Sequence, residues 1–405
     1  MPRSTDLDWM LATLLARLEL ELPAATELRR RLHAQPELAH AEHETAATIA
    51  RELPVPAASA AGTGLIARVG EGTGAIAVRA ELDGLALEEQ TEAPFAATGG
   101  TMHACGHDVH MAALVALVRA ANALARELPA PLLAVFQPSE EAYPSGAEQL
   151  ATDELTASSP TAVVAAHVHP ELAWGSVALG DGTVNASCDA IEIVVDGQPS
   201  HGAYPHEGRD PVLALAEIVV ALHAQVGRRI DPLAPAVLTV GVLEAGSAEN
   251  VIPAQARARG ALRAYRPEDR EALRELVEEV VSGVATANGC RGRVELVPGE
   301  PALVNDPQIV RLARGLLAEA GLAAAAQWRS CGSDDFAFFA SLAPLAMAFV
   351  GLDGADGFLV RPLHHPQMLP PDGAVGAVAR TLAVLYVAAA AATPTPGASR
   401  AGTDP

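Results

Sequence analysis

Four short apolar segments constrain the fold of this chain more than any other feature of its sequence. Each is followed by polar residues and then by a stretch with helical periodicity, and they cover residues 74–80, 131–137, 161–167 and 345–351. This alternation is typical of α/β folds, in which helices cover both faces of a sheet. We therefore predict an α/β domain with a mixed sheet and helices on both faces.

A different pattern fills residues 185–297. Strand-like and helix-like segments follow one another there in the order β-α-β-β-α-β, at residues 190–197, 210–226, 236–246, 256–265, 270–289 and 291–299. This is the order of a ferredoxin-like unit. At 405 residues the chain also exceeds what one hydrophobic core usually organises. We expect an inserted α+β domain (185–297) within a larger domain (1–184 and 298–391), followed by a disordered tail (392–405).

Composition excludes several classes of function. The net charge of −22 repels nucleic acid and anionic bilayers, so we expect neither as a partner. All the basic side chains are arginines, because the sequence contains no lysine. That absence excludes a P-loop NTPase, a pyridoxal Schiff base and a lysine-dependent aldolase.

The cysteines and the terminal segments favour a cytoplasmic protein. Cys105, Cys188, Cys290 and Cys331 are widely spaced without a CxxC motif, as expected of free thiols in a reducing compartment. The N-terminal residues lack the basic and apolar regions of a secretory signal. The longest apolar run, residues 381–392, is too short to span a bilayer, and we predict a buried helix there.

Polar side chains gather where the predicted strands end. They are Glu81 and Asp83 after the first strand, Glu140 and Glu141 after the second, His167 at the end of the third, and His364 and His365 after the fourth. In open α/β sheets the chemistry lies beyond the carboxyl ends of the strands. Polar residues would rarely follow four different strands by chance. Their convergence at one edge of the sheet favours a hydrolase with two metal ions.

The segment TMHACGHDVHMAA, residues 101–113, is the densest of these groups. Cys105 and His107 are two residues apart, so in an extended loop their side chains point the same way. A helix expected over residues 108–124 begins directly behind them, and its dipole lowers the pKa of a nearby thiol. The pair is half of a metal site, although a catalytic Cys/His pair would have the same appearance.

The other groups leave choices open. Adjacent glutamates are most often an exposed acidic turn, but Glu140 and Glu141 can also divide the work, one binding metal and the other accepting a proton from water. From His167 and His169 we expect one ligand, because an unpaired buried imidazole is costly. From His364 and His365 we also expect one.

Several motifs together resemble those of a known family. They are LHAQPELAHAEHETA, RAELDGLALEE, MHACGHDVHMAA, FQPSEEAYPSGA, HVHP, SHGAYPHEGRDPV, NVIP, GSDDFAFF and LHHP, in this order. The chain resembles the amidohydrolase branch of the co-catalytic metallopeptidases, which includes hippurate hydrolase, N-acyl amino acid amidohydrolases and plant auxin-conjugate hydrolases. The resemblance implies hydrolysis of the amide bond of an N-acyl amino acid, a small-molecule substrate, by water that two divalent metal ions activate.

The resemblance also implies roles for individual residues. The metal ligands would be Cys105, His107, Glu141, His167 and His364, with the Cys105 thiolate bridging two ions of zinc or manganese, or of cobalt or nickel. Glu140 would be the general base, and Asp83 would orient a ligand histidine. In the inserted domain, His201 would stabilise the oxyanion as the domain closes. Its other expected substrate contacts are Asn250 and Arg263, with Gly332 on a loop lining the cleft.

Two departures from the family pattern and several alternatives remain. The family usually has aspartate where this chain has Glu81, and the GALRAY segment around Arg263 also differs. Within the family, a metallo-carboxypeptidase or a biosynthetic deacetylase would use the same ligands. Outside it, the chain would be a hydrolase with a Cys105 nucleophile or a silent homologue that binds a small ligand. The oligomeric state is also open, and a homodimer or homotetramer through the inserted domain is one alternative.

Overall fold

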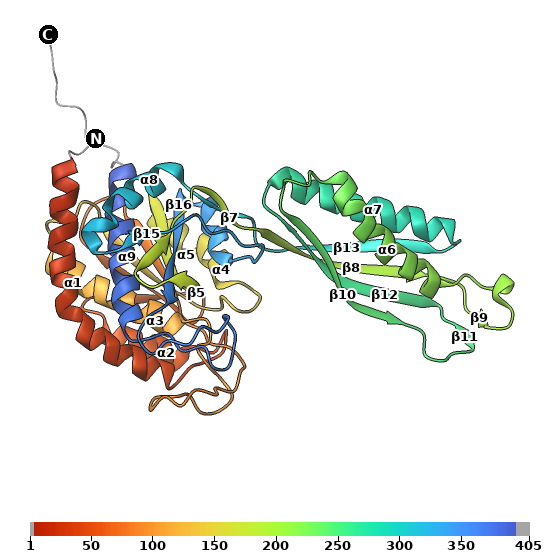
Figure 1. The fold of residues 1–405 in the computed structure, drawn as a ribbon, viewed down its shortest axis with the longest axis horizontal. Coiled ribbons are helices and arrows are strands. Elements are labelled where there is room, and N and C mark those ends of the chain that lie inside the picture. Colours follow the sequence, from red (N-terminus) through yellow and green to blue (C-terminus); the bar gives the residue numbers. More distant parts are fainter. Residues whose placement is uncertain (1–3, 394–405) are drawn as a thin grey trace, which may run out of the picture. The chain divides into compact units, whose positions relative to one another are not determined.

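The chain divides into two units in a computed structural model that describes residues 4–393, with side chains from residue 7 (Figure 1). The first unit runs from the N-terminal end of the described chain to Gly182 and includes Val304–Trp328 and the chain from Phe338 onward. The second comprises Thr183–Leu303 and Arg329–Ala337. Its main segment begins and ends within a few residues of the expected insertion, but the short return segment was not predicted from the sequence.

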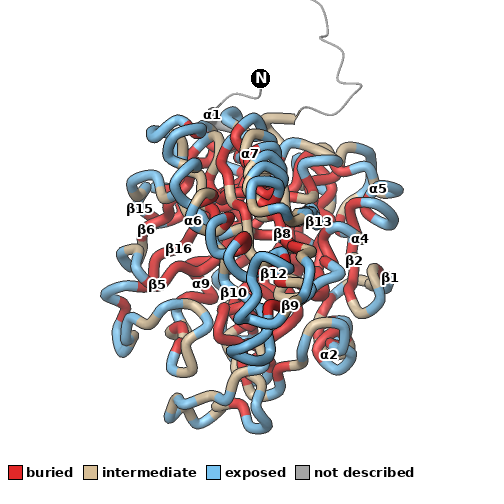
Figure 2. The backbone as a smooth tube through the Cα atoms, turned by 90° about the vertical axis from the view of Figure 1, so that its right-hand side faces the viewer, coloured by how far each residue is buried: buried red, intermediate tan, exposed pale blue. Residues whose placement is uncertain are grey.

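The first unit contains an eight-stranded mixed sheet in the order β1-β2-β4-β3-β5-β16-β6-β15. The four predicted strands are its central neighbours β4, β3, β5 and β16, which run parallel, so their carboxyl ends meet at one edge. Figure 2 shows β5 and β16 as buried segments. The strands are β1 (Ala57–Ala60), β2 (Gly64–Val69), β3 (Ile76–Glu81), β4 (Leu132–Gln137), β5 (Ala162–Ala173), β6 (Ser176–Ala178), β15 (Ala323–Ala324) and β16 (Leu345–Asp353).

Helices pack around this sheet. Helices α3 and α9 pack on the central strands, and α4 packs on β4. Helix α1 packs on both α3 and α9. The helices of this unit are α1 (Ser4–His33), α2 (His43–Glu52), α3 (His107–Ala123), α4 (Gly146–Thr152), α5 (Glu154–Ser158), α8 (Pro307–Leu316), the 3-10 helix η2 (Ala318–Ala320) and α9 (Gly373–Ala392). The mixed sheet and its covering helices confirm the predicted fold class.

Helix α9 is longer than its apolar run alone predicted, because it begins at Gly373 rather than near Thr381. Within residues 4–393, α6 (Pro211–Arg229) and α9 are long and apolar enough to cross a membrane, but most of α9 is buried in the core of the first unit. The helix ends at Ala392, the first residue of the expected tail, and residues 394–405 lie outside the described chain.

The second unit has the predicted β-α-β-β-α-β order. Its four-stranded antiparallel sheet has the order β10-β12-β8-β13, and helices α6 and α7 pack on it through the alternate, inward residues of β8, such as Ile191 and Ile193. Its elements are β8 (Ser187–Asp196), β9 (Ser200–His201), the 3-10 helix η1 (Pro205–Glu207), α6 (Pro211–Arg229), β10 (Ala236–Ala245), β11 (Val251–Ile252), β12 (Gln255–Ala264), α7 (Pro267–Ala287) and β13 (Arg291–Pro298). Three further elements span the unit boundaries: β7 (Gly182–Asn185), β14 (Leu303–Asn305) and the 3-10 helix η3 (Asp335–Ser341).

Helix starts follow the local sequence. Asp210 caps α6, accepting hydrogen bonds from the backbone N–H groups of Val212 and Leu213, and Asp306 caps α8 in the same way. A proline follows each of these caps at the first helical position, where its missing N–H has no cost. These two helices therefore begin where sequence-level capping rules place them.

A buried ion cluster fixes the first turn of α3. The Asp108 carboxylate accepts hydrogen bonds from Arg29 Nε at 2.6 Å and from His33 Nδ1 at 2.9 Å, and all three side chains are buried. Arg29 also donates to the Pro370 carbonyl, and His33 Nε2 lies 3.2 Å from Glu89 Oε1. The cluster therefore ties α1 to the start of α3 and to the segment before α9.

The substitution Asp108→Asn should destabilise the first unit. It leaves the buried Arg29 guanidinium and His33 without their shared counter-charge, a change that typically costs about 3 to 5 kcal/mol. Urea unfolding should show the loss as a lower midpoint. The matched control Glu279→Gln breaks the exposed pair with Arg229 and should change the midpoint little; equal effects of the two substitutions would contradict the account.

Stability should also fall at alkaline pH through His33. Burial alone lowers the pKa of His33, but Asp108 and Glu89 outweigh it and raise the pKa from 6.5 to about 9. A pKa that is higher in the folded than in the unfolded protein stabilises the fold, and the full contribution is present below the unfolded-state pKa. For His33 this contribution disappears as pH rises through about 9. The difference in unfolding free energy between wild type and His33→Gln should therefore shrink by about 3 kcal/mol from pH 6 to pH 10. A pH-independent difference would contradict this assignment.

Candidate metal centre

The donor side chains of the first unit come from its central strands, from the segments that follow them and from the start of α3. His167 lies within β5, which continues to Ala173 and does not end at His167 as expected, whereas Asp83 follows β3, and Glu140 and Glu141 follow β4. His107 is the first residue of α3. The parallel arrangement of the strands brings these ends to one edge of the sheet, as the sequence predicted.

Two groups of potential ligand atoms share Glu141. Cys105, Glu141 and His364 each offer a ligand atom within 4.8 Å of the others, and so do His107, Glu140 and Glu141. The Nε2 atom of His364 lies 3.2 Å from Glu141 Oε1. The Sγ atom of Cys105 lies 3.4 Å from His167 Nε2. The structure thus brings together all five side chains expected to be ligands, together with Glu140.

Main-chain carbonyl groups orient two of the imidazoles. His107 Nδ1 donates to the Asp83 carbonyl oxygen at 2.8 Å, and His167 Nδ1 donates to the Val168 carbonyl oxygen at 2.7 Å. Because a carbonyl can only accept, Nδ1 carries the proton in both rings and Nε2 is left for another partner. Such hydrogen bonds are typical of histidines that bind metal through Nε2.

Several buried polar atoms at this site have no hydrogen-bond partner among the described residues. They include His107 Nε2, Glu141 Oε1, which lies 3.2 Å from His364 Nε2 but outside hydrogen-bond geometry, and Asp83 Oδ1. Leaving such atoms unpaired is costly, and a divalent cation held by thiolate, imidazole and carboxylate would satisfy the first two. The residues therefore fit a metal centre.

The charges at the site couple metal binding to proton release. Burial raises the pKa of the Cys105 thiol well above its usual range. Burial lowers the pKa of His107, but the nearby Glu81 and Asp83 outweigh this effect and raise it well above its usual range. Burial lowers the pKa of His167 well below its usual range, so its ring is neutral. A cation must therefore displace protons from Cys105 and His107 when it binds.

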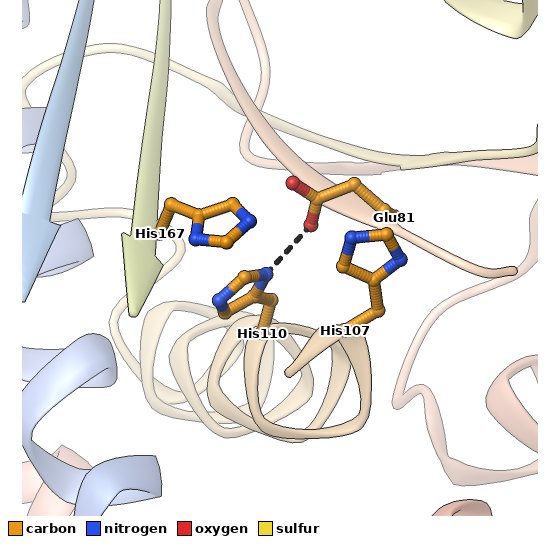
Figure 3. A group of neighbouring side chains, drawn as sticks. All are labelled: Glu81, His107, His110 and His167. Carbon is orange, nitrogen blue, oxygen red and sulfur yellow. Dashed lines mark hydrogen bonds and ion pairs between the residues drawn. The ribbon is translucent and has the colours of Figure 1, made fainter. Parts of the chain in front are cut away.

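A third group shares His107 and His167 with the expected ligands. Figure 3 shows Glu81, His107, His110 and His167 with their ring and carboxylate atoms turned toward one another, and a hydrogen bond of 2.9 Å joins His110 Nδ1 to Glu81 Oε2. All four side chains are buried. Sequence reasoning placed Glu81 among the polar residues at the strand ends and noted it as a departure from the family pattern, but it gave His110 no role. Its place one helical turn after His107 is the signal that would have found it.

Asp83 acts differently from the expectation. Its main-chain carbonyl, rather than its carboxylate, is the closer partner of His107, because the carboxylate oxygen Oδ1 lies 3.6 Å from Nδ1. The other carboxylate oxygen accepts a hydrogen bond from the Glu141 backbone N–H at 2.9 Å. Burial raises the pKa of Asp83, but contacts with His107 and with the backbone of Glu141 outweigh it and lower the pKa. The carboxylate therefore holds the glutamate loop in place.

The two alternative histidines lie in other environments. His365 Nδ1 accepts a hydrogen bond from the Gln367 backbone, whereas His364 lies beside Glu141. The ring centroid of His169 lies 4.5 Å from that of Trp328, and its Nδ1 accepts from the Glu171 backbone. Neither His365 nor His169 belongs to a group of potential ligands among the described residues.

The expected substrate residues of the second unit form two pairs. His201 lies on β9 opposite Val251, and the Asn250 carbonyl accepts a hydrogen bond from Gly202, so His201 and Asn250 are neighbours. Arg263, on β12, donates to the Cys331 carbonyl at 3.1 Å and thus lies beside Gly332. Their contacts with substrate stay a prediction.

Gly106 allows α3 to begin close to β5. Its φ of +87° lies in the left-handed region, and an added Cβ would lie 2.5 Å from Cγ2 of the buried Val168. Other residues adopt this backbone conformation only with strain. Glycine at this position therefore lets Cys105 and His107 approach His167.

Comparisons with known proteins agree with this geometry. Residues 77–388 match the model of a family described as Peptidase family M20/M25/M40. The N-acetyl-L-cysteine deacetylase of Bacillus subtilis is 34% identical over 86% of this chain and 84% of its own. The N-acetyldiaminopimelate deacetylase of Bacillus licheniformis is 30% identical over 91% and 99%. The Bacillus subtilis YXEP protein, described as a dinuclear metal binding peptidase, has 29% identity and a TM-score of 0.80 over 91% and 98%.

The substitution Gly106→Ala should disturb the site as well as the fold. The left-handed conformation costs alanine about 1 to 2 kcal/mol, and displacing Val168 adds about 1 to 3 kcal/mol. Gly354→Ala is a matched control, because Gly354 has a φ of +86° with no atom within 4 Å of the added Cβ. Unfolding and zinc titration should show that only Gly106→Ala weakens zinc binding. Equal zinc affinity in both variants would contradict the account.

Proposed function

The chain belongs to Peptidase family M20/M25/M40, and on that premise we propose that this hydrolase is a metal-dependent amidohydrolase acting on N-acyl amino acids. The observation that carries the proposal is the meeting of one thiol, three imidazoles and two carboxylates at one edge of the sheet. Two relatives are named as deacetylases of N-acetylated amino acids, which favours N-acetyl substrates over hippurate-like ones.

Five side chains would hold two divalent ions: Cys105, His107, Glu141, His167 and His364. Such ions supply Lewis acidity that lowers the pKa of water from about 15.7 toward about 7. A thiolate among the ligands favours zinc, whereas the carboxylate and imidazoles also suit manganese. The two imidazoles fixed by carbonyl groups need little rearrangement to bind through Nε2.

Glu140 would be the general base. Its Oε2 atom lies 3.8 Å from His107 Nε2, next to the ligand atoms. The carboxylate would take a proton from the attacking water and then give it to the nitrogen of the departing amino acid. Both steps need one carboxylate that reaches the scissile amide. The position of Glu140 beside the proposed metal ligands supports this role.

A cysteine-nucleophile hydrolase fits the site less well. Such an enzyme needs an accessible thiol with a lowered pKa, whereas Cys105 is buried and burial raises its pKa. We also propose a cytoplasmic location, which the four free thiols support. A carboxypeptidase of the same family would use the same metal ligands. Hydrolysis of dipeptides would distinguish it from an N-acyl amino acid amidohydrolase.

Replacing Glu140 by glutamine should abolish turnover and leave metal content unchanged. The amide cannot accept a proton, and loss of a general base typically lowers the rate about 10²- to 10⁴-fold. Metal analysis and assays on N-acetyl amino acids, N-benzoyl amino acids and dipeptides would test this. Glu148→Gln, an exposed substitution on α4, serves as the control. A Glu140→Gln enzyme as fast as that control would remove Glu140 from its role.

A further inference from the structure

A row of buried hydrogen bonds crosses the sheet behind the proposed ligands. Gln137 Oε1 on β4 accepts from Arg79 Nε on β3 at 2.7 Å, and Arg79 forms an ion pair with Glu81. Glu81 Oε2 accepts from His110 Nδ1 on α3, and His110 Nε2 lies 3.0 Å from the Val168 backbone nitrogen on β5. The row therefore links three strands and one helix.

The last bond fixes the protonation of the His110 ring. A backbone N–H can only donate, so His110 Nε2 must carry its lone pair toward Val168. The proton then lies on Nδ1, which donates to Glu81. Both ring nitrogens are thus engaged, and His110 has no lone pair left for a cation. Although its atoms lie within 4.8 Å of those of His107 and His167, it is not a ligand.

The Val168 N–H bonds to His110 because strands β3 and β5 no longer pair at this position. The ladder between β3 and β5 ends at the pair Arg79 and Ala165, so Val168 lies beyond it. Its N–H donates to His110, and its carbonyl accepts from His167 Nδ1 at 2.7 Å. The His110 and His167 rings also pack with centroids 4.6 Å apart.

We propose that His110 is a positioning residue, which holds the backbone at Val168 and thereby sets the ring of His167 for metal binding. Glu81 and Arg79 support it, because the carboxylate fixes the His110 tautomer and the buried guanidinium balances its charge. The inference rests on the proposed function, since it takes His167 as a ligand.

Three substitutions separate this role from others. Glutamine places an acceptor near the position of Nε2 and can still bind the Val168 N–H, whereas asparagine reproduces only the donor at Nδ1 and leucine neither. If His110 acts through Val168, His110→Gln should keep zinc affinity within about threefold, and His110→Asn and His110→Leu should lose about 10- to 100-fold, with zinc stoichiometry unchanged. Competition with a chromophoric chelator measures the affinity.

The contrary outcomes are distinct. Lower zinc stoichiometry in all three variants would make His110 a ligand, and unchanged affinity in all three would leave it a purely structural residue. Equal losses for glutamine and asparagine would remove Val168 from the account. Nitrogen-15 NMR of histidine-labelled, metal-free protein should show a neutral ring protonated at Nδ1 that is absent from His110→Gln. That result is independent of metal, so failure of the wild type to bind zinc would contradict the proposed function alone.

Discussion

The first turn of α3 is the constraint on which the site depends. Gly106 lets the helix begin against Val168 of β5, and Asp108 is held from the other side by Arg29 and His33 of α1. His107 lies between these two anchors, and Cys105 directly precedes Gly106. A shift of this turn would move two donors at once, so the packing of the core and the chemistry of the site share the same few contacts.

Hydrogen bonds from the protein prepare the donors before any cation arrives. Carbonyl groups fix His107 and His167, and the Asp83 carboxylate fixes the backbone at Glu141. Imidazoles already oriented in this way lose little freedom on binding. The remaining cost is removal of protons from Cys105 and His107, which makes metal affinity depend on pH.

The sequence was most informative where local pattern determines structure. Short buried runs identified β3, β4, β5 and β16, and the segments that follow β4 and β16 carry Glu140, Glu141 and His364. The sequence was least informative where a contact joins distant segments. His110 bonds to the backbone of Val168, and the His107 proton goes to a main-chain carbonyl, which any residue at position 83 would supply. Only the assembled sheet brings those groups together.

The most direct test of the account is a metal analysis of the purified chain combined with X-ray absorption at the zinc edge. The account predicts that the chain loaded with zinc holds two ions and shows a sulfur neighbour at about 2.3 Å, contributed by Cys105. A fully loaded protein whose zinc has only nitrogen and oxygen neighbours would contradict the thiolate ligand. A chain that takes up no metal would contradict the central claim that these donors form a metal centre.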